Sequence, residues 1–166
     1  MKTSGTKTVL VDTREQRPLL FPGTVRLRGR LYKILVDRVR LDAGDYQLRQ
    51  GCKRRCIVER KSGLWEIYTN YLTPDRKRYK RAMDKLCAAT DRPVLLVESS
   101  IPQLLTPQTA ATNRPAIPDP GLVLQHLVDD CSVRGISLVF GGYAQFASKR
   151  RKLGELVLRI LLAKTP

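Results

Sequence analysis

The stretch "AGDYQLRQGCKRRCIVERKSG" at residues 43–63 contains a Gly-Asp turn, a run of basic residues and a short apolar segment that ends in charged side chains. This pattern predicts a strand after the turn, a hairpin loop at residues 49–55 and a second strand at residues 56–61. Side chains two residues apart in a strand lie on the same face, so Glu59 and Lys61 are expected to project together, with Asp45 across the turn. The stretch therefore predicts two carboxylates and one ammonium group at one place.

Two carboxylates that converge repel each other unless a cation lies between them. Mg²⁺ binds one or two carboxylates together with waters and phosphate oxygens, and phosphodiester hydrolysis needs such a metal and a nearby positive charge. Asp45, Glu59 and Lys61 supply these parts. The alternative is a salt-bridged hairpin in which Lys61 only neutralises Glu59. Asp12 and Glu15 favour the metal site, because they place more acids at a strand end, where α/β folds keep their sites.

Apolar runs and helical spacing extend the prediction over the rest of the chain. Strands are expected at residues 8–15, 93–99 and 136–142, and residues 32–48 form a strand, a turn and the start of another strand. Helices are expected at residues 64–72, 73–87, 119–135 and 144–164, the third opened by Asp119-Pro120 and ended by Gly135. Residues 100–120, rich in Pro, Thr and Ala, form an irregular loop or insertion. The order predicts an α/β fold, a mixed central sheet with a parallel centre, flanked by helices.

The charge balance points to a polyanionic partner. There are 31 Lys and Arg against 15 Asp and Glu, a net charge of +16, and a field of one sign attracts nucleic acid. An anionic membrane surface is the main alternative partner, but no apolar run approaches the roughly 20 residues that span a bilayer. With three Phe and one Trp, phosphate contacts rather than base stacking are expected to dominate binding. No membrane association and a cytoplasmic or nucleoid location are expected.

Two groups of basic residues are the candidate phosphate contacts. The first lies in the predicted hairpin loop, and the second covers one predicted helix more densely than its two nearby acids can neutralise. The alternative for the helix is an ordinary solvated face. The candidates are Lys53, Arg54 and Arg55 in the loop, and Arg76, Lys77, Lys80 and Arg81 on the helix.

The four cysteines are expected to be free thiols. Cys52 and Cys56 have a spacing that a metal site could use, but the spacing alone is weak and the single histidine, His126, is distant in sequence. Cys56, beside two apolar residues, fits a buried strand position. No stoichiometric zinc is therefore expected.

Three segments give the chain a family resemblance. "VDTRE" (residues 11–15), "GDYQL" (residues 44–48) and "VERKSG" (residues 58–63) resemble the nuclease domain of the XPF family of structure-specific endonucleases, as do the later "DRKRYKRAMDKL" and "PVLLVES". The resemblance implies a restriction-endonuclease-like core. It also implies cleavage of branched or flapped DNA with Mg²⁺ or Mn²⁺, in DNA repair or recombination. The alternative is a non-catalytic junction-binding module or partner subunit on the same fold.

The resemblance also implies roles for individual residues. Asp45 and Glu59 are the implied metal ligands, and Asp12 completes the acidic cluster. Lys61 is the implied catalytic lysine, which orients or deprotonates water. The remaining two, Glu15 and Arg60, are expected to support the site.

The chain departs from the family pattern in two ways. The family places an Asp four residues after the lysine, where this chain has Trp65, and Glu66 comes one residue later. One residue along a helix is a rotation of about 100°, so Glu66 is not assumed to replace that acid. The 166 residues are also expected to form a single nuclease domain without the helix-hairpin-helix module of many relatives.

A homodimer through the C-terminal helices is expected. The segment "LGELVLRILLAK" (residues 153–164) is apolar around most of its circumference, more than one buried helix face needs. The alternative is that the chain itself buries both faces of this helix.

Overall fold

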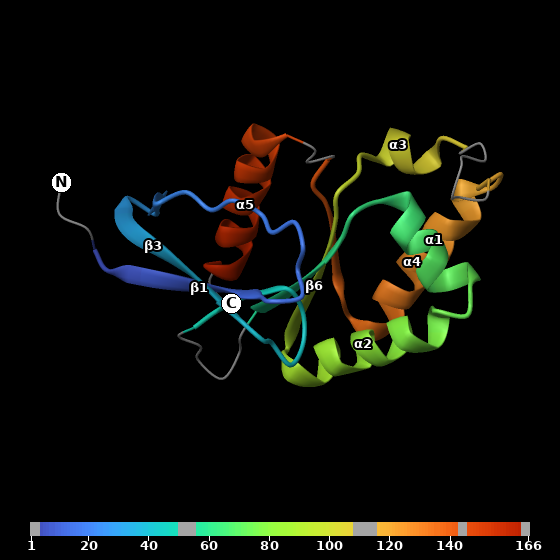
Figure 1. Ribbon diagram of the computed structural model, residues 1–166, viewed down its shortest axis with the longest axis horizontal. Coiled ribbons are helices and arrows are strands. Elements are labelled where there is room, and N and C mark those ends of the chain that lie inside the picture. Colours follow the sequence, from blue (N-terminus) through green and yellow to red (C-terminus); the bar gives the residue numbers. More distant parts are fainter. Residues whose placement is uncertain (1–3, 50–55, 108–115, 143–145, 164–166) are drawn as a thin grey trace.

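The structure is a computed structural model that describes residues 4–49, 56–107, 116–142 and 146–163 (Figure 1). A seven-stranded sheet forms its centre, in the order β2-β3-β1-β4-β5-β6-β7. The strands are β1 (Thr6–Asp12), β2 (Thr24–Leu27), β3 (Arg30–Val39), β4 (Tyr46–Leu48), β5 (Cys56–Lys61), β6 (Arg92–Val97) and β7 (Ser137–Phe140). The helices are α1 (Leu64–Leu72), α2 (Arg76–Ala89), α3 (Ile101–Leu105), α4 (Pro120–Arg134) and α5 (Ala147–Leu161). The predicted mixed sheet flanked by helices is confirmed.

Strand direction decides which ends of the strands meet. β1 pairs in parallel with β3, and β5, β6 and β7 form a second parallel set. The three-residue β4 lies between β1 and β5 and runs antiparallel to both. The predicted parallel centre is therefore wrong, because the middle strand is reversed. The reversal brings the amino end of β4 to the same sheet edge as the carboxyl ends of β1, β5 and β6.

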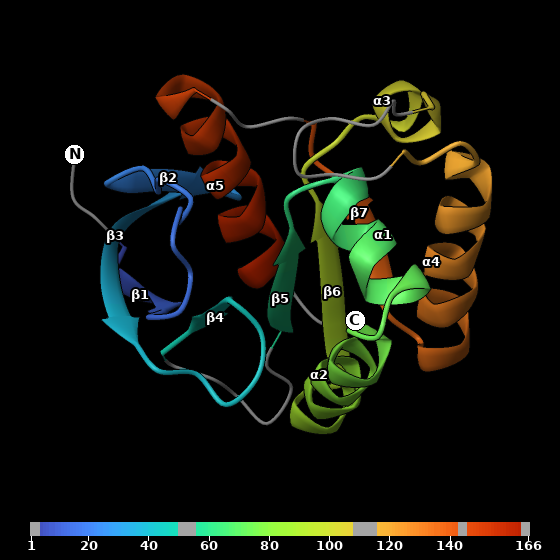
Figure 2. The ribbon, with the colours of Figure 1, turned by 45° about the vertical axis from the view of Figure 1, so that its right-hand side comes forward.

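The helices cover the two faces of the sheet separately. Figures 1 and 2 show α5 on one face and α1, α2 and α4 grouped on the other. β5 illustrates the division, since Val58 belongs to the core under α5 and Ile57 belongs to the core under the other helices. Side chains that alternate along one strand thus enter different cores, as the period of two requires.

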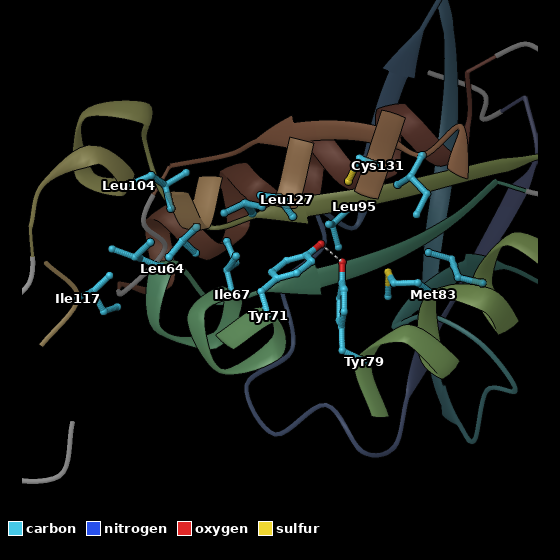
Figure 3. Close-up of a cluster of buried hydrophobic side chains, with 14 of the residues drawn as sticks. Leu64, Ile67, Tyr71, Tyr79, Met83, Leu95, Leu104, Ile117, Leu127 and Cys131 are labelled. Carbon is cyan, nitrogen blue, oxygen red and sulfur yellow. Dashed lines mark hydrogen bonds between the residues drawn. The ribbon is translucent and has the colours of Figure 1, made fainter. Parts of the chain in front are cut away.

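The core beneath α1, α2 and α4 contains a buried polar pair (Figure 3). Tyr71 of α1 and Tyr79 of α2 place their hydroxyl oxygens 2.6 Å apart, and Tyr71 also donates to Asp130 of α4 at 3.3 Å. Buried hydroxyl groups need such partners, so these bonds fix how the three helices sit relative to one another. Met83 and Leu86, both fully buried, continue the inward stripe of α2.

The segment at residues 18–22 packs against the Gly154 side of α5, while Lys149, Arg151 and Lys152 of the same helix are exposed. The backbone of this segment lies against Gly154, where a Cβ atom would come within 2.2 Å of the carbonyl oxygen of Leu20. Arg150 of α5 donates to the carbonyl oxygen of Pro18. Leu153, Val157, Leu158 and Leu161 are buried, and Leu156, Ile160 and Leu162 pack against the same core.

The apolar side chains of α5 are therefore buried or partly buried by other parts of the same chain. The sheet and residues 18–22 bury the apolar face of α5, and self-association of the chain stays a prediction. Leu158 in particular is fully buried, so substituting it would test folding rather than self-association.

The starts of three helices can be compared with the sequence predictions. α3 lies inside the stretch predicted as irregular, and its start is fixed by a capping box between Ser100 and Gln103. α2 begins at Arg76, with Asp75 at the cap position but no side-chain capping bond. Asp119 does accept the capping bond from the Leu122 amide at 3.0 Å, as its position predicts.

The cysteines that can be placed are Cys56, Cys87 and Cys131, and all three are free thiols. Cys52 lies outside the described residues. None of the helices, searched over the same residues, has the length and apolar character needed to cross a membrane.

Gly154 gives a test of the packing between α5 and residues 18–22. Alanine normally stabilises a helix interior relative to glycine by about 0.5–1 kcal/mol. Here we expect Gly154→Ala to destabilise the chain by about 1–3 kcal/mol, because the new methyl group meets backbone atoms that cannot rotate away. Urea unfolding measures the difference. Gly121→Ala on α4 is the control, since its new Cβ would meet only the side-chain Oδ1 of Asp119, at 3.3 Å. A stabilised Gly154→Ala variant would contradict the packing described.

Candidate active site

The predicted acidic residues meet at one edge of the sheet. Asp45 directly precedes β4, and its amide donates to the carbonyl oxygen of Val58 in β5 at 2.9 Å. Its own carbonyl oxygen accepts from the amide of Asp12, at the end of β1, at 3.0 Å. Asp45 is thus tied to strands on both sides. Glu59 and Lys61 lie beside it, two residues apart at the end of β5.

Gly44 explains why the turn before Asp45 contains glycine. Its φ of +68° lies in the left-handed region, where a side chain is strained. A Cβ atom at this position would also lie 2.3 Å from Cγ2 of Ile57 and 3.1 Å from the carbonyl oxygen of Val58. The missing side chain lets the turn lie directly on β5, and this contact sets the position of Asp45.

Lys61 lies between two carboxylates. Its Nζ is 2.8 Å from Oε1 of Glu59 and 3.2 Å from Oε1 of Glu66, and its side chain is only 10% exposed. Burial alone would lower the pKa of Lys61, but the charges of Glu59 and Glu66 outweigh it and raise that pKa above its ordinary value. Lys61 is therefore a fixed ammonium group at neutral pH.

Glu66 is a site residue that the sequence interpretation left undecided. It lies in the first turn of α1, and its Oε2 accepts bonds from both the amide (2.8 Å) and the hydroxyl (3.0 Å) of Ser62. Burial would raise the pKa of Glu66, but the charge of Lys61 and the bonds from Ser62 lower it. Glu66 thus does reach Lys61, although it lies one residue beyond the position where the family has its acid. Its long side chain and the bonds from Ser62 make up for the rotation of about 100° that one helix residue brings.

Asp45 carries the largest electrostatic strain of the described acids. Burial and then the negative charge of Glu59 raise its pKa to about 8, although the backbone amide of Arg60 donates to its Oδ2 at 2.8 Å. A carboxyl group held in this way is protonated at neutral pH unless a cation joins it. Asp45 and Glu59 therefore form a place that favours bound positive charge.

Arg60 points to the opposite face of β5 and holds a second ionic cluster. Its Nη1 is 2.9 Å from Oε2 of Glu15, and its Nε donates to Oε1 of Glu98 at 2.7 Å. Glu98, which directly follows β6, is 4% exposed. Sequence reasoning missed Glu98, although its place after a buried strand was the available signal. The cluster joins the ends of two strands to the loop after β1.

Asp12 ends β1, as the sequence predicts, and its carboxyl group is held by several hydrogen bonds. Its Oδ1 accepts from the amide and Nε of Arg14, its Oδ2 accepts from Nη2 of Arg14 and from the amide of Leu41, and the residue is 1% exposed. The bonds from Arg14 in particular lower the pKa of Asp12 to about 2. Asp12 thus ties together the loops around the site, and its part in metal binding stays a prediction.

An open cleft of about 800 Å³ lies at this edge of the sheet. Its lining includes the loop after β1, the ends of β5 and β6, and parts of α1 and α3: Arg14, Glu15, Gln16, Arg17, Asp45, Glu59, Arg60, Lys61, Ser62, Gly63, Leu64, Trp65, Glu66, Glu98, Ser99, Gln103 and Thr106. Over the described residues, no three His, Cys, Asp or Glu side chains gather as a ready metal cage. Asp45 and Glu59 fit Mg²⁺ or Mn²⁺ nonetheless, because such ions take one or two carboxylates and fill their other positions with water and phosphate oxygens.

The predicted basic residues are placed only in part. Arg76, Lys77, Lys80 and Arg81 are exposed on α2, but none of them lines the cleft. The buried stripe of α2 turns toward the sheet, so its basic face turns away from it. Lys53, Arg54 and Arg55 lie outside the described residues. The cations that the structure places at the cleft are Arg14, Arg17, Arg60 and Lys61.

Comparisons with known proteins give one family and one fold. The family model described as the ERCC4 domain matches residues 11–140. Two solved structures are similar: XPF from Aeropyrum pernix, at 20% identity and a TM-score of 0.55, and the same protein in complex with DNA, at 18% identity and a TM-score of 0.52. The similarity covers 96% of this chain and 67% and 68% of those chains. No curated protein matches the chain.

The raised pKa of Asp45 predicts a pH-dependent stability of the metal-free protein. The carboxyl group holds its proton up to about pH 8 in the folded state but only to about 3.8 when unfolded, so its contribution is present in acid and is lost as the pH rises between these values. Asp45→Asn keeps the shape without the charge. Because the wild type begins to lose this contribution above the unfolded pKa of 3.8, we expect thermal melts in EDTA to show a variant whose advantage over the wild type grows from pH 5 to pH 8 and reaches about 5 °C or more at pH 8.

Asp129→Asn is the control for this experiment, because Asp129 is an exposed acid on α4. It should follow the wild type at both pH values. If Asp45→Asn and the wild type gave parallel curves from pH 5 to pH 8, Asp45 would not be the strained acid of the site.

Proposed function

The chain belongs to the ERCC4 domain family, and from this premise we propose that it is a divalent-metal-dependent DNA endonuclease. The observation that carries the proposal is the convergence of Asp45, Glu59 and Lys61 in one open cleft. Acidic residues of a strongly basic chain are concentrated where a phosphate would approach. A protein that only binds DNA does not need carboxylates at that place. Following the resemblance, we propose branched or flapped DNA as the substrate.

Asp45 and Glu59 would hold Mg²⁺ or Mn²⁺. When bound, such an ion polarises a phosphate and lowers the pKa of a coordinated water. Burial of Asp45 beside Glu59 keeps the two carboxylates together, and the short bond from the Arg60 amide orients the first of them. Without a cation this arrangement is unfavourable, so metal affinity should rise as Asp45 loses its proton.

Lys61 would act as a cation and not as a base. Its raised pKa keeps the ammonium charged, and Glu59 and Glu66 hold it at the cleft. A fixed positive charge near the reacting phosphate stabilises negative charge that develops during hydrolysis. Arg60, Glu15 and Glu98 would support this arrangement from the other face of the sheet.

Asp45→Asn tests the proposed metal site. We expect cleavage of flap and fork DNA to be lost in Mg²⁺ or Mn²⁺, because one of two carboxylate ligands is removed. DNA binding should persist or tighten, because a negative charge near the phosphates is removed. Gel assays with flap, fork, four-way and plain duplex DNA, each with Mg²⁺ or EDTA, measure cleavage and binding. Asp129→Asn should cleave as the wild type does.

A second readout does not depend on activity. Mg²⁺ should raise the melting temperature of the wild type at pH 8, since a ligand that binds only the folded state stabilises it. Mg²⁺ should leave the melting temperature of Asp45→Asn unchanged. A wild type that binds the DNA but neither cleaves it nor responds to Mg²⁺ or Mn²⁺ would replace the proposal with the non-catalytic binding module.

The salt dependence of binding tests which cations contact DNA. Arg17 lies in the cleft wall, so we expect Arg17→Ala to reduce the slope of log K against log salt by about 0.9 for duplex DNA, the value of one phosphate contact. Arg30→Ala on β3, an exposed cation of the same charge, is the control and should leave the slope unchanged.

The double variant Lys77→Ala, Lys80→Ala tests α2 in the same titration. An unchanged slope would remove those two positions from the interface.

A further inference from the structure

Trp65 forms part of the cleft wall beside the proposed catalytic residues. It is half-buried at the second position of α1, and Glu66, the next residue, contacts Lys61 at 3.2 Å. Trp65, Glu66 and Lys61 all line the same cleft. Trp65 is also the one tryptophan of the chain.

The position of the indole is fixed by a second aromatic ring. Tyr68 lies one helical turn further along α1, and the two ring centroids are 5.3 Å apart at an interplanar angle of 72°. This edge-on contact is a favourable aromatic geometry that restrains the tryptophan side chain. Trp65 is therefore a supported surface and not a side chain that swings freely.

The rest of the cleft has the composition of a nucleotide site. Gln103 within α3 and Thr106 directly after it line the cleft together with Trp65, and Gln16 and Arg17 line it from the loop after β1. A volume of about 800 Å³ is within the range of small-ligand pockets. The Oε1 of Gln103 accepts from Ser100 and the hydroxyl of Thr106 donates to the carbonyl oxygen of Pro102, so the cleft offers chiefly an aromatic wall for a base and cations for a phosphate.

We propose that Trp65 and the cleft wall around it bind an unpaired nucleotide, whose base stacks on the indole while the adjacent phosphate reaches Lys61. A base within a duplex has both faces covered by its neighbours, so only an unpaired, unstacked base can offer a face to the cleft. Trp65 then selects for single-stranded character next to the cleaved bond. This inference rests on the proposed nuclease function, because it names the part of the substrate that the same cleft takes.

Intrinsic fluorescence tests the proposal directly, because all tryptophan emission comes from Trp65. The titrations use the whole chain in EDTA, with a single-stranded oligothymidine probe and a blunt hairpin duplex. We expect the single strand to quench the emission in a saturable way and the duplex to bind without quenching. Binding of the single strand with unchanged emission would overturn the proposal.

Variants give an independent measure through the polarisation of labelled probes. Trp65→Ala should weaken binding of the single strand about tenfold, the effect expected for one lost base–aromatic stack, and leave duplex binding unchanged. Trp65→Phe, which keeps an aromatic ring, should retain most of the affinity. Arg17→Ala is the matched comparison, and it should weaken both probes alike because it removes a charge. Equal losses for both probes with Trp65→Ala would also overturn the proposal.

These outcomes separate the inference from the proposed function, since no measurement requires cleavage. If the single strand quenches Trp65 but no DNA is cut in Mg²⁺ or Mn²⁺, the stacking site stands and the nuclease fails. If branched DNA is cut while single strands leave the emission unchanged, the nuclease stands and the stacking site fails.

Discussion

The insertion of a short reversed strand between two parallel sets is the constraint on which the site depends. β4 has three residues, yet it joins β1 on one side to β5 on the other. Its reversal presents its amino end, and hence Asp45, at the edge where β5 and β6 end. A parallel strand in that position would send Asp45 to the far edge. The left-handed φ of Gly44 and its contact with Ile57 make the reversal possible at this short distance.

The sequence predicts those parts of the site that one strand controls. Glu59 and Lys61 lie in one continuous strand, so the period of two is enough to place them on the same face. Asp12 shows the limit of this reasoning. Its position at a strand end is predictable, but the bonds from Arg14 and the Leu41 amide that use its oxygens come from loops, and no periodicity describes them.

The same contrast holds for the helices. The apolar residues of α5 predict a buried helix correctly, but they do not show which partner covers each side. Residues 18–22 have no regular pattern, so the sequence gives no sign that they lie across Gly154. Glu66 is a similar case, because its reach to Lys61 depends on side-chain length and on the bonds from Ser62. Long-range contacts through loops therefore account for most of what pattern reasoning missed.

The alternation of β5 also divides the charged residues by role. Arg60 faces the α5 side at the rim of the cleft, where its guanidinium group pairs directly with both Glu15 and Glu98, so each carboxylate of this cluster already has a cationic partner. Glu59 and Lys61 face the cleft, where Asp45 adds a carboxyl group whose pKa is raised to about 8. A buried ionic cluster needs complete pairing to be tolerated, whereas an incompletely compensated one gains stability when a cation arrives. β5 thus presents the supporting residue Arg60 on one face and the proposed catalytic residues Glu59 and Lys61 on the other. These residues are adjacent in sequence, so a shift of one residue along the strand would exchange their faces.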